Sequence, residues 1–289
     1  MGTHEHDHQH GHHHGHHHHH DDGFDWEAMA DRLELDAAIV EPITRQVVGA
    51  LPGPFRHVLD VGCGPGAVAV TLAELAPDAT VTALDSSAAL LQRVRVEAER
   101  RGIAHRVHAM EGDLEHDLPE LPAVDLVWAG MVLHHVGQPV ATLQRLHRQL
   151  LPGGTLAMME FGRTPTVLPD HDPVVVSGAW ARFQAATTAS LNERLGLDPV
   201  AVDWPALLAV AGFIDVVDRD LEAVHPGQPT ATVRAWLVPH LARGVEMAGD
   251  RLDPSDAAAI LELATQVPHR DDLTVVARRR IVTARRPAG

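Results

Sequence analysis

The feature that most constrains the fold is a group of closely spaced glycines that follows a short apolar run. Residues 58–61 combine β-branched and aliphatic side chains, as expected of a buried strand, and glycine then fills every second position of residues 62–66. Glycines allow tight turning and a close approach of the backbone to a ligand. Pro65 suits the first turn of a helix, which the apolar pattern of residues 67–76 predicts. A strand, a glycine-rich turn and a helix N-terminus together predict a site for a charged, nucleotide-like ligand.

Two ligand types fit this stretch. Gly62, Gly64 and Ala67 match the G-x-G-x-x-G/A pattern of dinucleotide sites, and an acidic residue, Asp85, follows at a suitable spacing. An ionised Asp60 would repel a pyrophosphate, whereas it would attract a ligand that carries an ammonium group. The carboxylate therefore favours an amino-acid-bearing nucleoside, and an NAD(P)-dependent oxidoreductase stays open as an alternative.

Composition limits the remaining function classes. The chain has 289 residues, 45% of them hydrophobic, which suits one enlarged globular domain. A formal net charge of −16 argues against broad nucleic-acid binding. Cys63 is the only cysteine, so neither an intrachain disulfide nor a thiolate metal cluster can form. No apolar run approaches the length of a membrane span, and the beginning is not a signal peptide, so we expect a soluble, cytoplasmic protein.

The chain begins with a histidine-rich segment. Residues 1–22 are of low complexity and are expected to be a disordered tail, because they cannot bury a core. Neutral imidazoles at this density bind divalent metal ions adventitiously and without a fixed geometry. The irregular spacing favours a native segment over an affinity tag, and a metal-responsive binding protein is a further alternative function. The candidate ligands are His12, His13, His14, His16, His17, His18, His19 and His20.

Strands and helices are expected to alternate through the first half of the chain. Apolar, β-branched runs predict strands at residues 58–61, 81–85, 107–110, 125–129 and 155–161. Asp85 ends the second of these strands and Asp113 follows the third, at the edge where open α/β sheets bind ligands. This alternation predicts an α/β fold with a parallel, doubly wound sheet.

Five ordered motifs lie within residues 24–162: Leu59–Gly66, Leu84-Asp85, Gly112-Asp113, Leu133-His134-His135 and Leu151–Gly154. Together they resemble the class I S-adenosylmethionine-dependent methyltransferases. The resemblance is to the small-molecule type, similar to the methyltransferases of ubiquinone and menaquinone biosynthesis. It implies a Rossmann-like sheet of seven strands whose last strand runs antiparallel, and methyl transfer by in-line displacement, with catalysis mainly by proximity and orientation.

The resemblance also implies which residues bind S-adenosyl-L-methionine. The glycine-rich turn and Asp60 would surround its methionine part, Asp85 would bind the ribose hydroxyls, Asp113 with Leu114 would contact the adenine, and Gly130 would lie near the sulfonium. The full set of expected cofactor-binding residues is Asp60, Gly62, Cys63, Gly64, Asp85, Ser86, Gly112, Asp113, Leu114 and Gly130.

Residues for the methyl acceptor, expected to be a small molecule, are less well defined by the sequence. His134 and His135 are candidate general bases for an alcohol, phenol or amine, because the pKa of histidine suits that role. Glu160, Trp180 and Phe183 are candidate substrate contacts. The alternatives are a solvated acid at the end of a strand for Glu160, and a place in the helix core for Trp180 and Phe183. O-, N- and C-methylation stay open, and so does a homodimer.

The methyltransferase domain is expected to span residues 23–289. Residues 23–52 predict N-terminal cap helices, divided or kinked at Pro42. Residues 163–200 predict a lid-like insertion with a helix at 179–195, and residues 223–270 a second helical insertion. The last two strands are expected at 213–217 and 275–284.

Overall fold

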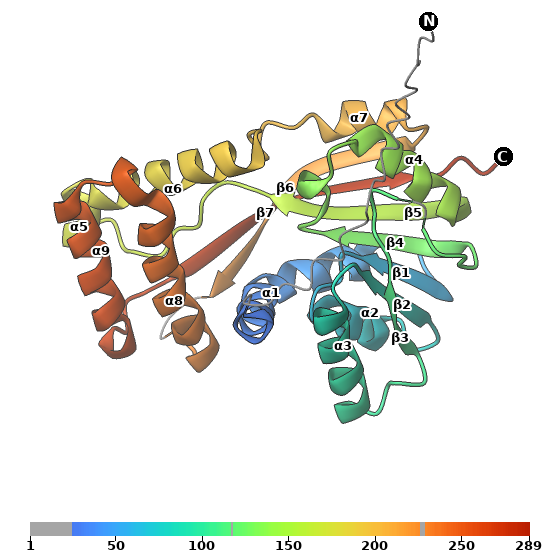
Figure 1. Ribbon diagram of the computed structural model, residues 1–289, viewed down its shortest axis with the longest axis horizontal. Coiled ribbons are helices and arrows are strands. Elements are labelled where there is room, and N and C mark those ends of the chain that lie inside the picture. Colours follow the sequence, from blue (N-terminus) through green and yellow to red (C-terminus); the bar gives the residue numbers. More distant parts are fainter. Residues whose placement is uncertain (1–24, 117, 226–228) are drawn as a thin grey trace, which may run out of the picture.

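The computed structural model describes residues 25–116, 118–225 and 229–289. In this part of the chain, seven strands form one sheet that carries helices on both faces (Figure 1). The strands are β1 (His57–Val61), β2 (Thr80–Asp85), β3 (Val107–Glu111), β4 (Val124–Gly130), β5 (Leu150–Phe161), β6 (Ile214–His225) and β7 (Val275–Arg285). The helices are α1 (Trp26–Ala50), α2 (Ala67–Leu75), α3 (Ala88–Arg100), α4 (Pro139–Gln149), α5 (Pro173–Val176), α6 (Ala179–Leu195), α7 (Trp204–Val210), α8 (Ala231–Ala248) and α9 (Pro254–Gln266), with short 3₁₀ turns η1 (Leu133–His135), η2 (Gly249–Arg251) and η3 (Val267–His269).

The order of the strands is β3-β2-β1-β4-β5-β7-β6. Strands β1 to β5 pair in parallel, and β7 runs antiparallel to both of its neighbours, β5 and β6. The predicted Rossmann-like sheet with an antiparallel last strand is therefore confirmed. The direction of winding changes between β1 and β4, and ligands of open α/β sheets bind at such a point, beyond the carboxyl ends of the strands.

Helices bury an apolar layer on each face of the sheet. On one face α1, α2 and α3 contribute Ile43, Leu72 and Leu91, which are almost fully buried. On the other face α4 and α7 contribute Leu143 and Leu208. Because both faces are covered, the edge formed by the strand ends is left for a ligand site.

Helix α1 is continuous, and the predicted division of the N-terminal cap at Pro42 is wrong. Pro42 lies inside the 25-residue helix. Ile39 and Val40 before the proline and Ile43 and Val47 after it are all buried on the same packed side. This continuous apolar contact holds the helix together where the proline removes a backbone hydrogen bond.

Helices α5, α6, α8 and α9 form a group of their own at one side of the sheet, and α1 lies between this group and α3 (Figure 1). Helices α5 and α6 occupy the expected lid-like insertion, and α8 and α9 the second insertion. That insertion begins later than the predicted residue 223, because β6 continues to His225. The ribbon of β6 and β7 extends past the last pair between β5 and β7, Phe161 with Arg279. At its tip, His225 Nε2 lies 2.8 Å from the carbonyl oxygen of Ile39, which ties the ribbon to α1.

Candidate active site

The glycine-rich turn brings the ends of β1 and β4 into direct contact. Gly62, Gly64 and Gly66 have φ angles of +63°, +55° and +89°, in the left-handed region that favours glycine. A Cβ atom on Gly62 would lie 2.3 Å from Cγ2 of Val132, in the segment after β4. Pro65 lies in the turn before α2 and not in its first helical turn, because Gly66 is the residue that caps the helix.

Asp85 links three strand ends. Its Oδ2 accepts a hydrogen bond from the backbone N–H of Gly64 and its Oδ1 from that of Ser87, both at 2.9 Å. The backbone N–H of Cys63 donates to the carbonyl oxygen of Leu84 at 3.0 Å, and that of Gly112 donates to the carbonyl oxygen of Asp85, also at 3.0 Å. These bonds hold the turns after β1, β2 and β3 next to one another, as the sequence predicted.

Asp60 is a buried carboxyl without a complete set of partners. It is 2% exposed, and its Oδ2 accepts no hydrogen bond. Burial, and then the charge of Asp85, raise the pKa of Asp60 well above its usual value. A Cβ atom on Gly64 would approach no atom closer than Cδ1 of Leu33, at 3.6 Å, so there is open space beside this one glycine of the turn. A buried, unpartnered carboxyl oxygen before a turn that leaves space beside Gly64 fits the ammonium group of an amino-acid ligand.

Cys63 has no environment for nucleophilic chemistry. Its thiol is buried, and this burial raises its pKa far above the usual range. A thiol that stays protonated is a poor nucleophile and a poor metal ligand. Cys63 therefore contributes its backbone and its volume to the turn.

The remaining predicted cofactor residues lie along the same edge. Ser86 is exposed after β2, whereas Leu114 is buried in the core on the α4 side. Asp113 accepts a hydrogen bond from the backbone N–H of Glu115 at 2.8 Å and lies 2.8 Å from Nδ1 of His116. The Glu115 N–H, and then His116, lower the pKa of Asp113, so this carboxylate stays ionised.

A buried carboxylate fixes the turn that follows β4. Glu160 Oε1 accepts the backbone N–H of Leu133 at 2.9 Å, and Oε2 lies 2.7 Å from His134 Nδ1. Met131, with a φ of +57°, directly follows Gly130 and donates its N–H to the carbonyl oxygen of Met159 at 2.7 Å. Glu160 is 1% exposed, so the structure places it inside the protein, holding η1, and not on a surface open to an acceptor.

His135 is the exposed member of the histidine pair. Its ring centroid lies 4.0 Å from that of the buried His134. Partial desolvation, and then the charges of His134 and Arg194, lower the pKa of His135. Arg194 belongs to α6, so the charge of a residue in the helical group acts on His135. A neutral imidazole in this position can accept a proton near neutral pH.

Trp180 and Phe183 belong to the packing between α6 and α8. Both are buried, with ring centroids 5.5 Å apart. A Cβ atom on Gly244 of α8 would lie 2.4 Å from Cζ of Phe183, so the ring fills the space that this glycine leaves. The alternative weighed from the sequence, helix core, describes their position in the structure.

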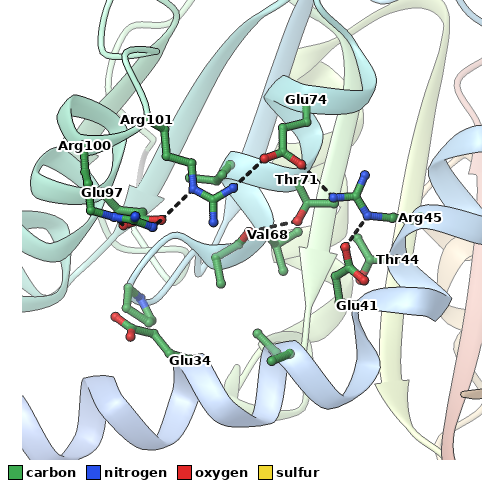
Figure 2. A pocket seen from close by; sticks show the side chains of 15 residues that line it. Glu34, Glu41, Thr44, Arg45, Val68, Thr71, Glu74, Glu97, Arg100 and Arg101 are labelled. Atoms are coloured by element: carbon green, nitrogen blue, oxygen red, sulfur yellow. Dashed lines mark hydrogen bonds and ion pairs between the residues drawn. The ribbon is translucent and has the colours of Figure 1, made fainter. Parts of the chain in front are cut away.

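A cleft of about 320 Å³ lies between α1, α2 and α3 (Figure 2). Pro65 and Ala67 line it from behind the glycine-rich turn, so the cleft adjoins the predicted cofactor site without containing its acids. Most of its charged residues pair with one another: Glu74 binds Arg45 and Arg101, each at 2.6 Å. Glu34 instead lies 3.6 Å from Arg93, outside the lining, and burial raises its pKa.

The described ranges 25–116, 118–225 and 229–289 contain no group of three or more His, Cys, Asp or Glu side chains placed to hold a metal ion. The candidate metal ligands His12 to His20 lie outside these ranges. Within the same ranges, no helix has the length and apolar character to cross a membrane. Metal binding by the tail, a homodimer and a cytoplasmic location stay predictions.

Arg279 was not among the site residues predicted from the sequence. This residue of β7 pairs with Phe161 at the end of β5, and its Nε is buried without a hydrogen-bond partner. The available signal was the run of three arginines at 278–280, because alternate residues of a strand point to opposite faces.

Comparisons with known proteins identify the family of this chain. A family described as "Methyltransferase domain" matches residues 58–154. The trans-aconitate 2-methyltransferase of Methylobacterium radiotolerans is 32% identical over 218 residues, which cover 73% of this chain and 76% of that protein. The ubiquinone biosynthesis O-methyltransferase of Xanthomonas campestris is 34% identical over 145 residues, or 48% of this chain and 57% of that protein.

A solved structure shows the same fold. Phosphoethanolamine N-methyltransferase 2 of Haemonchus contortus, in complex with phosphomonomethylethanolamine and S-adenosylhomocysteine, superposes with a TM-score of 0.52 at 14% identity, over 92% of this chain and 61% of that one. The oxidoreductase and the metal-responsive binding protein find no support in these matches. The extent of the match to the Methylobacterium enzyme, together with the glycine-rich turn and its acids, shows that this chain belongs to the class I S-adenosylmethionine-dependent methyltransferases of the small-molecule type.

Proposed function

We propose that the methyl acceptor binds beside His135, between η1 and the helices α6 and α8. The observation that carries this proposal is the hydrogen bonding of Glu160, whose two oxygens hold Leu133 and His134. This buried arrangement fixes η1, and η1 in turn carries the exposed His135, on which the charge of Arg194 of α6 acts. A rigid support of this kind is what alignment of an acceptor requires.

S-adenosylmethionine is proposed to lie across the carboxyl ends of β1, β2 and β4. The unpartnered Oδ2 of Asp60 would accept its ammonium group, and the turn at Gly62 and Gly64 would lie against its methionine part. Asp85 would bind the ribose hydroxyls while keeping its bonds to the turn, since each carboxylate oxygen has two lone pairs. The side of the edge near Asp113 and the backbone of Leu114 would take the adenine.

The protein contributes mainly alignment and a site from which water is excluded. When bound, S-adenosylmethionine supplies a methyl group on a positively charged sulfur, open to in-line displacement. His135 would accept the proton of an acceptor hydroxyl, because its lowered pKa keeps the imidazole neutral near pH 7. His134 would act as a positioning residue, since Glu160 fixes its Nδ1.

A second candidate is methylation of a carboxylate, with trans-aconitate as the specific compound. It is favoured by the 32% identity to the Methylobacterium enzyme over three quarters of that protein. A carboxylate is already ionised and needs no general base. In this case His135 would matter for shape and not for proton transfer.

The test compares His135→Gln with a control, His105→Gln, which changes an exposed histidine. Release of S-adenosylhomocysteine is measured with trans-aconitate and with a panel of small phenols, alcohols and amines as acceptors. If His135 is a base, its variant lowers kcat for a hydroxyl acceptor by about 100-fold, at unchanged affinity for S-adenosylhomocysteine. Equal kcat values for both variants would refute the base role, and turnover of trans-aconitate alone would establish the second candidate.

A further inference from the structure

Three consecutive arginines of β7 have very different surroundings. Arg278 Nε lies 2.7 Å from Glu222 Oε1, and Arg280 Nη2 lies 2.6 Å from Asp218 Oδ2. Arg279, between them, points to the opposite face of the sheet. Among the described residues, Arg279 takes part in no ion pair. It donates one hydrogen bond, from Nη1 to the carbonyl oxygen of Arg278, at 2.8 Å.

Arg279 lies in an apolar part of the sheet. Its neighbours on the same face of β7, Ala277 and Ile281, are buried, and Phe161 lies directly opposite on β5. The Nε of Arg279 is buried without a partner, although the residue as a whole keeps some exposure. A guanidinium with unused donors in such a place is costly unless an anion satisfies it.

The acids nearest to Arg279 are already engaged. Asp36 of α1 accepts the indole N–H of Trp236 at 2.8 Å. Glu160 has both oxygens bonded within η1. The charges of Asp36 and Glu160 raise the pKa of Arg279, but the larger effect of burial lowers it, so these acids do not compensate for the lost hydration.

A second arginine adds to the positive charge. Burial lowers the pKa of His240 to about 4, and the charges of Arg243, on α8, and of Arg279 lower it as well, against the opposing charge of Asp36. The ring of His240 stacks on Trp236 with centroids 4.4 Å apart. Arg243 likewise takes part in no ion pair within the described part of the chain, and burial lowers its pKa. Two cationic groups, one on α8 and one on β7, therefore act on His240 and its surroundings. The charges of Asp36 and Glu246 oppose part of the effect of burial at Arg243.

The position of Arg279 connects this space to the proposed acceptor site. Arg279 forms the last pair between β7 and β5, opposite Phe161. The ring of Phe161 contacts that of His134, with centroids 4.7 Å apart, and the ring of His134 contacts that of His135 at a tilt of 45°. Arg279 thus lies one side chain away from the segment beside which the acceptor is proposed to bind.

We propose that Arg279 binds an oxyanion of the methyl acceptor, a carboxylate or a phosphate, and that Arg243 provides a second positive charge. The acceptor is therefore an anionic small molecule, held by this group while another of its atoms, or a second carboxylate, receives the methyl group. This inference rests on the proposed position of the acceptor beside His135. A planar guanidinium suits this task, because it can donate two parallel hydrogen bonds to one oxyanion.

The test uses full-length protein saturated with S-adenosylhomocysteine and measures ligand binding by calorimetry. The probes are trans-aconitate as a carboxylate, glycerol 3-phosphate as a phosphate, and trimethyl trans-aconitate as an uncharged control. The variants are Arg279→Met, which removes the charge and keeps the length, and Arg279→Lys, which keeps the charge. Arg278→Met is the matched control on the other face of β7.

We expect the wild-type protein to bind one of the two anions and not the ester. Which anion binds shows whether the oxyanion of the acceptor is a carboxylate or a phosphate. Arg279→Met weakens that binding about tenfold or more, Arg279→Lys restores part of it, and Arg278→Met leaves it unchanged. Arg279→Met also raises the Tm of the ligand-free protein, because it removes an uncompensated buried charge. This second readout shows that any loss of binding is not a failure to fold.

Three results would overturn the inference: unchanged binding in Arg279→Met, equal binding of the ester and the acid, or no binding of either anion at millimolar concentration. Affinity for S-adenosylhomocysteine is measured separately in every variant. If it is intact while anions fail to bind, only the anion site is wrong. If it is absent from the wild-type protein, the proposed cofactor site is wrong instead.

Discussion

Glu160 and His134 form a buried hydrogen bond, 2.7 Å between Oε2 and Nδ1, at the start of the turn that carries His135. The other oxygen of Glu160 binds the buried N–H of Leu133. Replacement by alanine leaves both donors without an acceptor. We expect Glu160→Ala to lower the free energy of unfolding by about 2–3 kcal/mol, measured by urea denaturation. Glu160→Gln keeps one acceptor oxygen and should cost about half as much.

A suitable control is Glu222→Ala, which removes a partly exposed ion pair with Arg278. Exposed pairs contribute roughly 0–1 kcal/mol, so this variant should be close to the wild type in stability. Equal losses in Glu160→Ala and Glu222→Ala would show that the buried bond does not stabilise η1.

Asp60 makes binding of S-adenosylhomocysteine dependent on pH. Burial and the charge of Asp85 raise the pKa of Asp60, so the free protein keeps this carboxyl protonated to a higher pH than an exposed aspartate. The ammonium group of the ligand favours the ionised form. Affinity should therefore rise with pH through the pKa of Asp60, below the pKa of the ligand's own ammonium group, and binding should release a proton. Calorimetry in buffers of different ionisation enthalpy measures that release.

The variant Asp60→Asn separates binding from stability. A carboxyl whose folded pKa exceeds the unfolded value stabilises the fold at low pH, and this contribution is lost as the pH rises through the folded pKa. At about pH 8, Asp60→Asn should thus raise the Tm of the ligand-free protein. It should also weaken binding and abolish the proton release. A variant that is less stable without ligand would contradict the assignment of an unpartnered carboxyl.

Gly62 is required by sterics as well as by its backbone conformation. An alanine there would place its Cβ 2.3 Å from Val132, at a φ of +63°. We expect Gly62→Ala to lower the free energy of unfolding by about 3 kcal/mol, which combines a left-handed alanine with an overpacked contact. Gly102→Ala is the matched control, because Gly102 has a φ of +69° and a Cβ atom there would have no neighbour within 4 Å. It should cost only about 1–2 kcal/mol. Similar losses would show that the contact with Val132 relaxes freely.

Arg93 of α3 holds the first turns of α1. Its guanidinium lies 2.5 Å from Glu27, 2.7 Å from Asp31 and 3.6 Å from Glu34. These acids are largely exposed, so Arg93→Gln should change global stability by less than about 1 kcal/mol. It should nevertheless accelerate hydrogen exchange of residues 26–34, and the effect should fall with added salt. Arg95→Gln, an exposed change on the same helix, should leave exchange unchanged. Equal exchange in both variants would disprove the role of Arg93.

The sequence predicted the strands whose side chains are buried on both faces, because they appear as apolar runs. It failed for the second half of β6, expected to end at residue 217 and observed to reach His225. Most residues of this strand are exposed, and charged residues interrupt its apolar pattern. Its pairing with β7 and its ion pairs, such as Asp218 with Arg280, sustain the strand, and none of these is visible in a local pattern.

The candidate site divides in the same way. The glycine-rich turn, Asp60 and Asp85 are local motifs, and the structure brings them together at one edge of the sheet. Glu160 binds Leu133 and His134, and Arg279 pairs across the sheet with Phe161, so the neighbours of both residues lie far away in the sequence. Whether Glu160 would be open to an acceptor or bonded to His134 depended on how η1 folds back onto β5, which no periodicity reveals.

The place of β7 between β5 and β6 determines the order in which the protein can be assembled during synthesis. β1, β2 and β4 all lie before residue 131 and pair with strands close in sequence, so this part can fold early on the ribosome. β6 has no partner until residues 275–285 emerge. The edge of β5 also stays unpaired until β7 is synthesised. An unpaired strand edge promotes aggregation and chaperone binding. The half of the sheet that carries Arg279 is therefore the last to be completed, and a stalled nascent chain would hold β1, β2 and β4 without β7.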